Sequence, residues 1–180
     1  QIFRDLTPEQ IARLPRCQGD LLLTEHSAGS LTSQAQIKAW HHQAELAAQA
    51  AETASVAARW LQLLDYNRYA INEAWHLLSL AEFHDILPGT SLPQCYDYSF
   101  NDLALARNLF EGTATDAVAA IAAKLDTKGQ GIPVVVYNPL PHDREDVVEV
   151  EVDAEAFGEA PMVAVGPDGR VTSCEVTGSS

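Results

Sequence analysis

Residues 83–91 read Phe-His-Asp-Ile-Leu-Pro-Gly-Thr-Ser and place an imidazole, His84, directly beside a carboxylate, Asp85. The residue before a proline disfavours helix and the following glycine permits a chain reversal, so the helical pattern of residues 69–82 must stop here. A polar pair held in a fixed turn is a candidate site. Taken alone, His84 has two interpretations, a hydrogen-bonded structural residue at a helix end or a metal ligand.

The composition limits the possible partners and compartments. At 180 residues and 47% hydrophobic content the chain can bury a real core. The net charge of −14, with 11 Lys and Arg in all, argues against binding to nucleic acid or to an anionic membrane surface. No apolar run is long enough to span a membrane, and the first residues do not resemble a signal peptide. We therefore expect a soluble chain.

The cysteines Cys17, Cys95 and Cys174 lie far apart and form no CxxC pair, so they indicate neither a disulfide framework nor a zinc ribbon. Isolated thiols of odd number suit the reduced state. The cytoplasm is therefore favoured, although the compartment stays open.

Three helical patterns must position the His-Asp pair. The first follows a possible N-cap at Thr32 or Ser33. Its apolar residues recur at the spacing of one helix face and are mostly alanine: Ile37, Trp40, Ala44, Ala47, Ala51, Ala54, Ala58 and Leu61. After a break at residues 65–67, the second pattern has its buried side at Ala70, Ala74, Leu77, Leu78 and Ala81. This second helix delivers His84.

The third pattern follows the turn and ends at residues 126–131. Its apolar positions are Leu103, Ala106, Phe110, Ala117, Ile121 and Leu125. Gly112 and Thr113 lower the helix propensity in its middle and leave room for a kink. Three long amphipathic helices with short connections predict an antiparallel bundle.

The period changes to that of strands beyond Gly131. Residues 134–137 form an apolar run, residues 147–152 alternate valine with glutamate, and further short strands are expected at residues 162–165 and 173–176 around a Gly-Pro-Asp-Gly turn. A short buried strand is also expected at residues 20–24. The predicted fold class is mainly α: an antiparallel three-helix bundle followed by a partial all-β, sandwich-like segment.

Other residues capable of binding have structural interpretations. His41 and His42 are neighbours in a helix and point about 100° apart, too divergent for a shared metal, so we expect solvated or inter-helix positions. His76 is expected to pack within its helix. Three tryptophans could stack on a ligand, but aromatic residues at helical positions favour the core: Trp40, Trp60 and Trp75.

Several motifs, taken in order, resemble the retaining α-mannosidases of glycoside hydrolase family 38. They are Gly-Asp-Leu-Leu-Leu at 19–23, Glu-His-Ser-Ala-Gly-Ser-Leu-Thr-Ser-Gln-Ala at 25–35, Asn-Glu-Ala-Trp at 72–75, the nine residues at 83–91, and Tyr-Asn-Pro-Leu-Pro at 137–141. The resemblance implies a piece of a larger enzyme. Residues 1–29 would end its α/β catalytic domain, residues 30–126 would form its three-helix middle domain, and residues 131–180 would begin its β-sandwich region.

The resemblance also implies a chemistry. It makes His84 one ligand of a single zinc ion and Asp85 a contact of mannose hydroxyls, and it places His26 in a loop that borders the sugar. No catalytic residue is identified in this chain: neither the aspartate nucleophile nor the general acid is recognisable in it, and the nucleophile and the other zinc ligands would lie upstream of Gln1. The implied partners are an α-mannoside or mannose-containing oligosaccharide and the remaining domains of the same polypeptide, with no nucleic acid and no membrane. One imidazole holds zinc weakly, so we expect the chain alone to be inactive and not to retain the ion.

Two alternatives stay open. Helical metal-dependent phosphohydrolases also use a His-Asp pair, but they need a further His and Asp on neighbouring helices. A non-catalytic helical module that docks domains or subunits would need no chemistry from His84 or Asp85.

Overall fold

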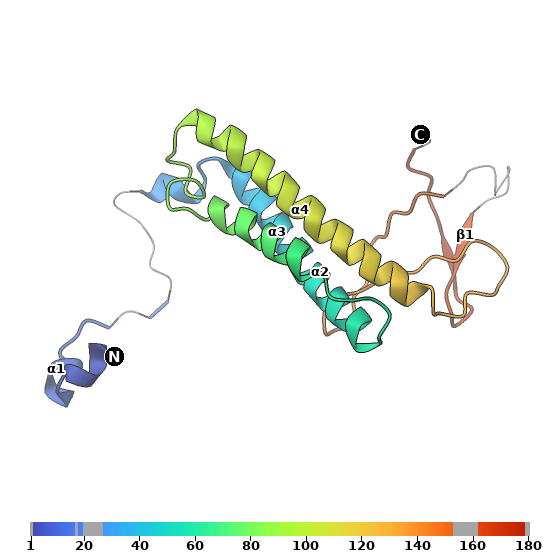
Figure 1. Cartoon of the computed structure of the whole chain (residues 1–180), viewed down its shortest axis with the longest axis horizontal. Coiled ribbons are helices and arrows are strands. Elements are labelled where there is room, and N and C mark those ends of the chain that lie inside the picture. The colour runs from blue at the N-terminus through green and yellow to red at the C-terminus, as the bar shows by residue number, and fades with distance from the viewer. Residues whose placement is uncertain (1, 17, 20–26, 153–161, 179–180) are drawn as a thin grey trace. The chain divides into compact units, whose positions relative to one another are not determined.

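The computed structural model describes residues 2–16, 18–19, 27–152 and 162–178. Its elements in chain order are the 3-10 helix η1 (Ile2–Asp5), α1 (Pro8–Ala12), the 3-10 helix η2 (Ala28–Leu31), α2 (Ala35–Trp60), α3 (Arg68–Ala81), α4 (Pro93–Ala122), β1 (Val163–Val165) and β2 (Val171–Ser173) (Figure 1). The chain divides into two compact units, residues 1–139 and 140–180. The predicted division into domains at residues 29 and 126–131 stays a prediction. Within the described ranges, no helix combines the length and apolar character needed to cross a membrane.

Contacts between helices give the direction of each helix in the bundle. The indole Nε1 of Trp75 donates to Glu52 at 2.9 Å, so the middle of α3 lies beside the middle of α2. The Trp75 ring also packs edge-on against Phe110 of α4 at 5.6 Å between centroids. Nearer the start of α2, Trp40 packs against Phe100 at 5.3 Å. Sequence numbers thus rise together along α2 and α4 and fall along α3, which confirms the antiparallel three-helix bundle (Figure 1).

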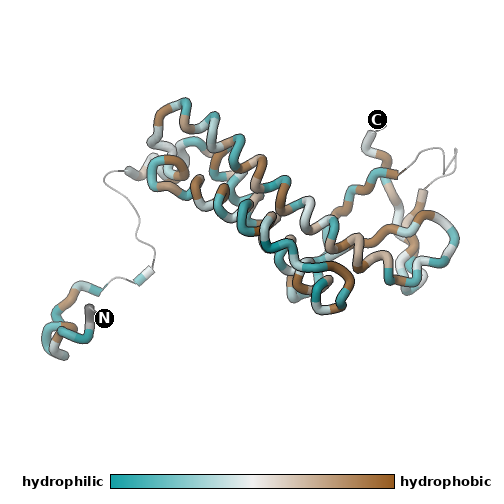
Figure 2. Tube along the Cα trace, viewed as in Figure 1, coloured by the Kyte–Doolittle hydropathy of each residue, from teal (hydrophilic) through white to brown (hydrophobic). Residues whose placement is uncertain are grey.

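Alanine dominates the inward face of α2. The buried residues of this helix are Ile37, His41, Ala44, Ala48, Ala51, Ala54, Ser55 and Ala58. Larger side chains of the other two helices complete the core, among them Leu78, Leu103 and Phe110, each no more than 1% exposed. Figure 2 shows the apolar residues recurring along each helix between polar ones. The spacing of apolar residues therefore identified the buried faces.

Four side chains expected inside the bundle lie outside it. Leu61 and Leu125 lie beyond the last residues of α2 and α4 and are 54% and 51% exposed. Trp60 is 85% exposed, and His76 is exposed as well. Each is two positions from a buried alanine, Ala58 or Ala74, and two positions along a helix is a rotation of about 200°. Helix geometry thus directs both side chains to solvent. Trp40 and Trp75 are half-buried against the core, as predicted.

The structure differs from two predictions about the helices, the possible kink in α4 and the N-cap of α2. The helix α4 continues without a break through Gly112, and the Thr113 hydroxyl donates to the Leu109 carbonyl at 2.7 Å, one turn back. The expected N-cap of α2 is wrong. Ser33 donates to the Gly29 carbonyl at 2.7 Å instead, and α2 begins after Gln34, whose φ of 52° is left-handed.

The second unit contains a two-stranded antiparallel sheet. Val163 pairs with Ser173 and Val165 with Val171, across a turn in which Gly166 donates to the Arg170 carbonyl at 2.8 Å. This confirms the hairpin around the predicted turn, although its second strand begins two residues earlier than expected.

Two other predicted strands are wrong. Residues 134–137 and 147–152 form no strand, and all of their valines except the half-buried Val152 are 40–86% exposed. A strand needs a hydrogen-bonded neighbour, and no described segment pairs with either run. Tyr137 is half-buried and packs against Ala54, Ala58 and Ala117. The strand expected at residues 20–24 lies outside the described residues.

Candidate functional site

The candidate site is the reversal between α3 and α4. Successive turns fold the chain back: the Ile86 amide donates to the Phe83 carbonyl at 2.8 Å, and the Gly89 amide donates to the Ile86 carbonyl at 3.0 Å. Gly89 has φ = 90°, a backbone conformation that residues other than glycine rarely adopt. The predicted stop of the α3 helix is confirmed within one residue, because α3 ends at Ala81.

This turn packs against the segment that leads into α2. A Cβ on Gly89 would lie 2.6 Å from the Ser33 Cβ and 2.9 Å from the Ser33 carbonyl carbon. The Lys38 ammonium links the same two segments, since it donates to the Ser33 carbonyl at 2.5 Å and to the Leu87 carbonyl at 2.6 Å. Partial burial of this ammonium lowers the pKa of Lys38 below its usual value. Residues about fifty positions apart thus hold the turn against the bundle.

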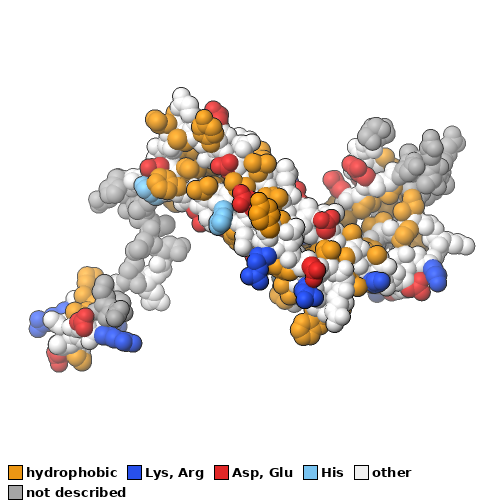
Figure 3. Space-filling model, viewed as in Figure 1, with side chains coloured by type: hydrophobic (Ala, Val, Ile, Leu, Met, Phe, Trp, Pro, Cys, Tyr) orange, Lys and Arg blue, Asp and Glu red, His pale blue; other side chains and the backbone are white. Residues whose placement is uncertain are grey.

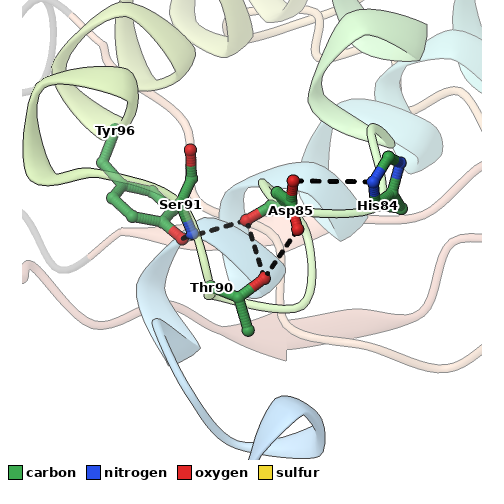
Figure 4. Close-up of polar contacts among 5 residues, drawn as sticks. All are labelled: His84, Asp85, Thr90, Ser91 and Tyr96. Atoms are coloured by element: carbon green, nitrogen blue, oxygen red, sulfur yellow. Dashed lines mark hydrogen bonds and ion pairs between the residues drawn. The ribbon is translucent and has the colours of Figure 1, made fainter.

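Hydrogen bonds fix Asp85 at both its backbone and its side chain (Figure 4). The Thr90 hydroxyl donates to Asp85 Oδ1 at 3.1 Å, and the Thr90 amide donates to the Asp85 carbonyl at 3.1 Å. The phenol of Tyr96, only 5% exposed, donates to the same carbonyl at 3.2 Å and accepts from the Ser91 amide at 3.0 Å. Asp85 therefore has a defined position before any ligand arrives. Its second oxygen, Oδ2, is directed to His84.

The imidazole of His84 is open to solvent. Its side chain is 78% exposed, its Nε2 lies 3.5 Å from Asp85 Oδ2, and its ring lies beside that of Phe83 at 4.3 Å between centroids. The Asp85 side chain is 49% exposed. The turn thus presents one nitrogen and one carboxylate outward, to a partner or ligand approaching from outside the bundle.

A zinc ion fits this pair only as part of a larger ligand set. Zinc in proteins usually takes about four ligands from His, Cys, Asp or Glu side chains and water. Across the described ranges, the one group of three candidate ligand side chains lies elsewhere, at His41, Glu45 and Glu82. His84 and Asp85 can therefore supply donors to a site that other residues must complete.

The remaining predicted site residues have different fates. His26 lies outside the described residues. His41 is buried between helices, with 6% exposure, whereas the His42 side chain is 70% exposed, so the two take the inter-helix and the solvated position respectively. Sequence reasoning missed the proximity of His41 to Glu82 as well as the roles of Thr90 and Tyr96. The four-residue spacing of His41 and Glu45 was a visible signal, but the approach of Glu82 depends on helix packing.

An apolar groove lies next to the turn, at the end of α3 and the start of α4. Its lining includes Leu80, Phe83, Ile86 and Tyr98. Leu80, Phe83 and Tyr98 are 54–74% exposed, which is high for large apolar side chains. The surface around His84 can therefore bury apolar area against another part of a protein.

Comparison with protein families gives one match. A family model described as the alpha mannosidase middle domain matches residues 25–121, just over half of the chain. No curated protein and no solved structure matches the chain. The matched range contains the turn with His84 and Asp85, together with α2, α3 and nearly all of α4.

Proposed function

Because the chain belongs to the alpha mannosidase middle domain family, we propose that it is the helical middle region of a retaining, zinc-dependent α-mannosidase that hydrolyses terminal α-mannosides. In this proposal the chain contributes two side chains to an active site shared with other domains of the same polypeptide. His84 is a ligand of the zinc ion, and Asp85 binds hydroxyls of the sugar. When bound, zinc supplies Lewis-acid polarisation of the sugar oxygens that it contacts.

The geometry of the turn carries the proposal. Asp85 is fixed by Thr90 and Tyr96 while the imidazole of His84 is 78% exposed. A neutral imidazole suits zinc, and a neighbouring carboxylate at 3.5 Å can orient the ring. Because the position of Asp85 is set in advance, binding a sugar costs little further ordering of this residue.

The apolar groove supports a composite site. Exposed Leu80, Phe83 and Tyr98 border the turn, so a second domain that covers them would also reach His84. That domain would supply the nucleophilic aspartate and the acid that protonates the leaving oxygen, since retaining hydrolysis needs both. The net charge of −14 disfavours binding to nucleic acid but does not oppose contact with another protein domain through an apolar surface.

The test uses the longer parent protein, with an aryl α-mannoside as substrate and with zinc content measured on the same samples. We expect His84→Ala to lose zinc and activity together. Asp85→Asn should keep zinc and lose activity. His76→Ala is the matched control, because His76 is an exposed histidine on α3 and should change neither quantity. Full activity of His84→Ala with zinc retained would reject the proposal.

Both alternatives make different predictions for the same proteins. A phosphohydrolase would cleave aryl phosphates when divalent metal is added, and it would need a further His and a further Asp on helices next to His84 and Asp85. A docking module would retain full α-mannoside hydrolysis in both His84→Ala and Asp85→Asn. The family match favours the α-mannosidase over these two.

A further inference from the structure

A second group of potential metal ligands lies between α2 and α3. His41 and Glu45 are one turn apart on α2, and Glu82 caps the C-terminus of α3. His41 Nδ1 is 3.6 Å from Glu45 Oε2, and His41 Nε2 is 3.3 Å from Glu82 Oε1. One ligand atom from each of the three residues lies within 4.8 Å of the other two.

His41 is buried but lacks a hydrogen bond at its Nε2 atom. Its side chain is 8% exposed, and although Glu82 is within ion-pair distance, the contact does not have hydrogen-bond geometry. Buried nitrogen atoms normally have a partner, so this one requires an explanation. A cation bound at Nε2, beside the Glu82 carboxylate, would provide a partner without a proton.

The two carboxylates also form no ion pair with a permanently charged side chain. Within the described part of the chain, Glu45 forms ion pairs with His41 and His42 alone, Glu82 forms one with His41 alone, and no Lys or Arg nitrogen lies within 4 Å of either carboxylate. Acidic side chains are scattered over the face of the bundle seen in Figure 3, and the net charge is −14. A field of this sign concentrates cations at the surface.

We propose that His41, Glu45 and Glu82 bind one divalent transition-metal ion, with water completing its coordination. Bonds of about 2.0–2.2 Å separate neighbouring ligand atoms by roughly 3–3.5 Å, whereas the ligand atoms here lie within 4.8 Å of one another, so they must move closer to bind one ion. The Glu45 and Glu82 side chains are 48% and 47% exposed, so both can move the short distance required. The imidazole favours zinc, cobalt or nickel over magnesium and calcium.

The site uses neither His84 nor Asp85. Its ion would join α2 to Glu82 at the end of α3, two residues before His84. Its role is structural, since it fixes the point from which the turn departs.

The test is titration of the 180-residue chain, freed of metal by a chelator, with zinc chloride in a calorimeter and with cobalt chloride in a spectrophotometer. We expect one ion per chain and a cobalt spectrum typical of mixed nitrogen and oxygen ligands. His41→Ala and Glu82→Gln should weaken binding by at least about 10- to 100-fold, since loss of outer-shell partners alone has effects of this size. Magnesium should not compete.

Two histidines close in sequence to the proposed ligands provide the controls, His42 beside His41 and His84 two residues after Glu82. His42→Ala removes an exposed imidazole that also contacts Glu45, and His84→Ala removes the proposed active-site ligand. Both variants should bind zinc as tightly as the wild type, within about threefold. Circular dichroism checks that each variant is helical, and the isosteric Glu82→Gln still decides the question if His41→Ala unfolds.

Absence of saturable zinc binding by the wild type would overturn the proposal, and so would unchanged binding by Glu82→Gln. Binding lost in His84→Ala but retained in His41→Ala would assign the ion to the turn instead and equally refute the site. Activity of the parent protein enters none of these measurements, so a failure here leaves the proposed α-mannosidase function standing.

Discussion

Replacing Gly89 with alanine should detach the turn from the segment before α2. An L-residue at φ = 90° carries a strain of about 1–3 kcal/mol. The added Cβ would lie 2.6 Å from the Ser33 Cβ, well inside contact distance, and overpacking of this kind costs about 1–3 kcal/mol more. Because separation of the two segments relieves part of the overlap, we expect the free energy of unfolding to fall by about 2–3 kcal/mol, the lower part of the sum of the two costs.

Thermal unfolding followed by circular dichroism measures this effect. A loss of that size lowers the midpoint of a domain near 100 residues by about 10–20 °C. Gly112→Ala is the matched control, because Gly112 lies inside α4 and no atom lies within 4 Å of its added Cβ. That substitution should raise stability by about 0.5–1 kcal/mol. A midpoint for Gly89→Ala at or above that of the wild type would refute the reasoning.

Three further predictions concern the core and the turn. Phe110→Ala should lower the free energy of unfolding in urea by about 3–5 kcal/mol, because Phe110 is completely buried, and a loss below about 1 kcal/mol would contradict the described core. Tyr96→Phe should lower the free energy of unfolding by about 1–2 kcal/mol and speed hydrogen exchange at the Ser91 amide, because the phenol is the partner of this amide. Unchanged exchange at Ser91 would contradict this hydrogen bond. Burial lowers the pKa of Lys38, so below pH 10.5 the unfolded chain binds more protons and the stability of the wild type rises with pH. Its stability relative to Lys38→Met should therefore increase toward pH 10.5, and a constant difference in urea titrations would count against the burial.

The helices were predictable because their information is local. The apolar period and the Leu-Pro-Gly breaker predicted a helix over residues 69–82, and α3 spans Arg68–Ala81. For Trp60 the aromatic character favours the core, but its position on α2, about 200° around the helix from Ala58, directs the side chain to solvent. Residues 134–137 failed for a different reason, since strand propensity takes effect only where a neighbouring strand supplies hydrogen bonds.

The candidate site was predictable only where its residues are adjacent in sequence. His84, Asp85 and the turn that holds them form one continuous segment. The contact of Lys38 with Leu87 spans 49 positions, and that of His41 with Glu82 spans 41. Both depend on how far α3 is shifted along α2. No spacing within one helix encodes this shift, because side chains on both helices determine it together.

The alanines on the inward face of α2 have a consequence for the site as well as for the core. Alanine loses almost no rotamer freedom on burial, so this face is ordered at little entropic cost, and methyl groups set how near its neighbours come. The alanines between Ile37 and Ala58 have no rotamers with which to accommodate added volume. A bulky residue at Ala44 would push α2 away from the neighbouring helices. Because Lys38 on α2 binds the Leu87 carbonyl, this displacement would also move the turn. The small alanine side chains of α2 therefore help to determine the position of the exposed His84, because they set the distance between the helices.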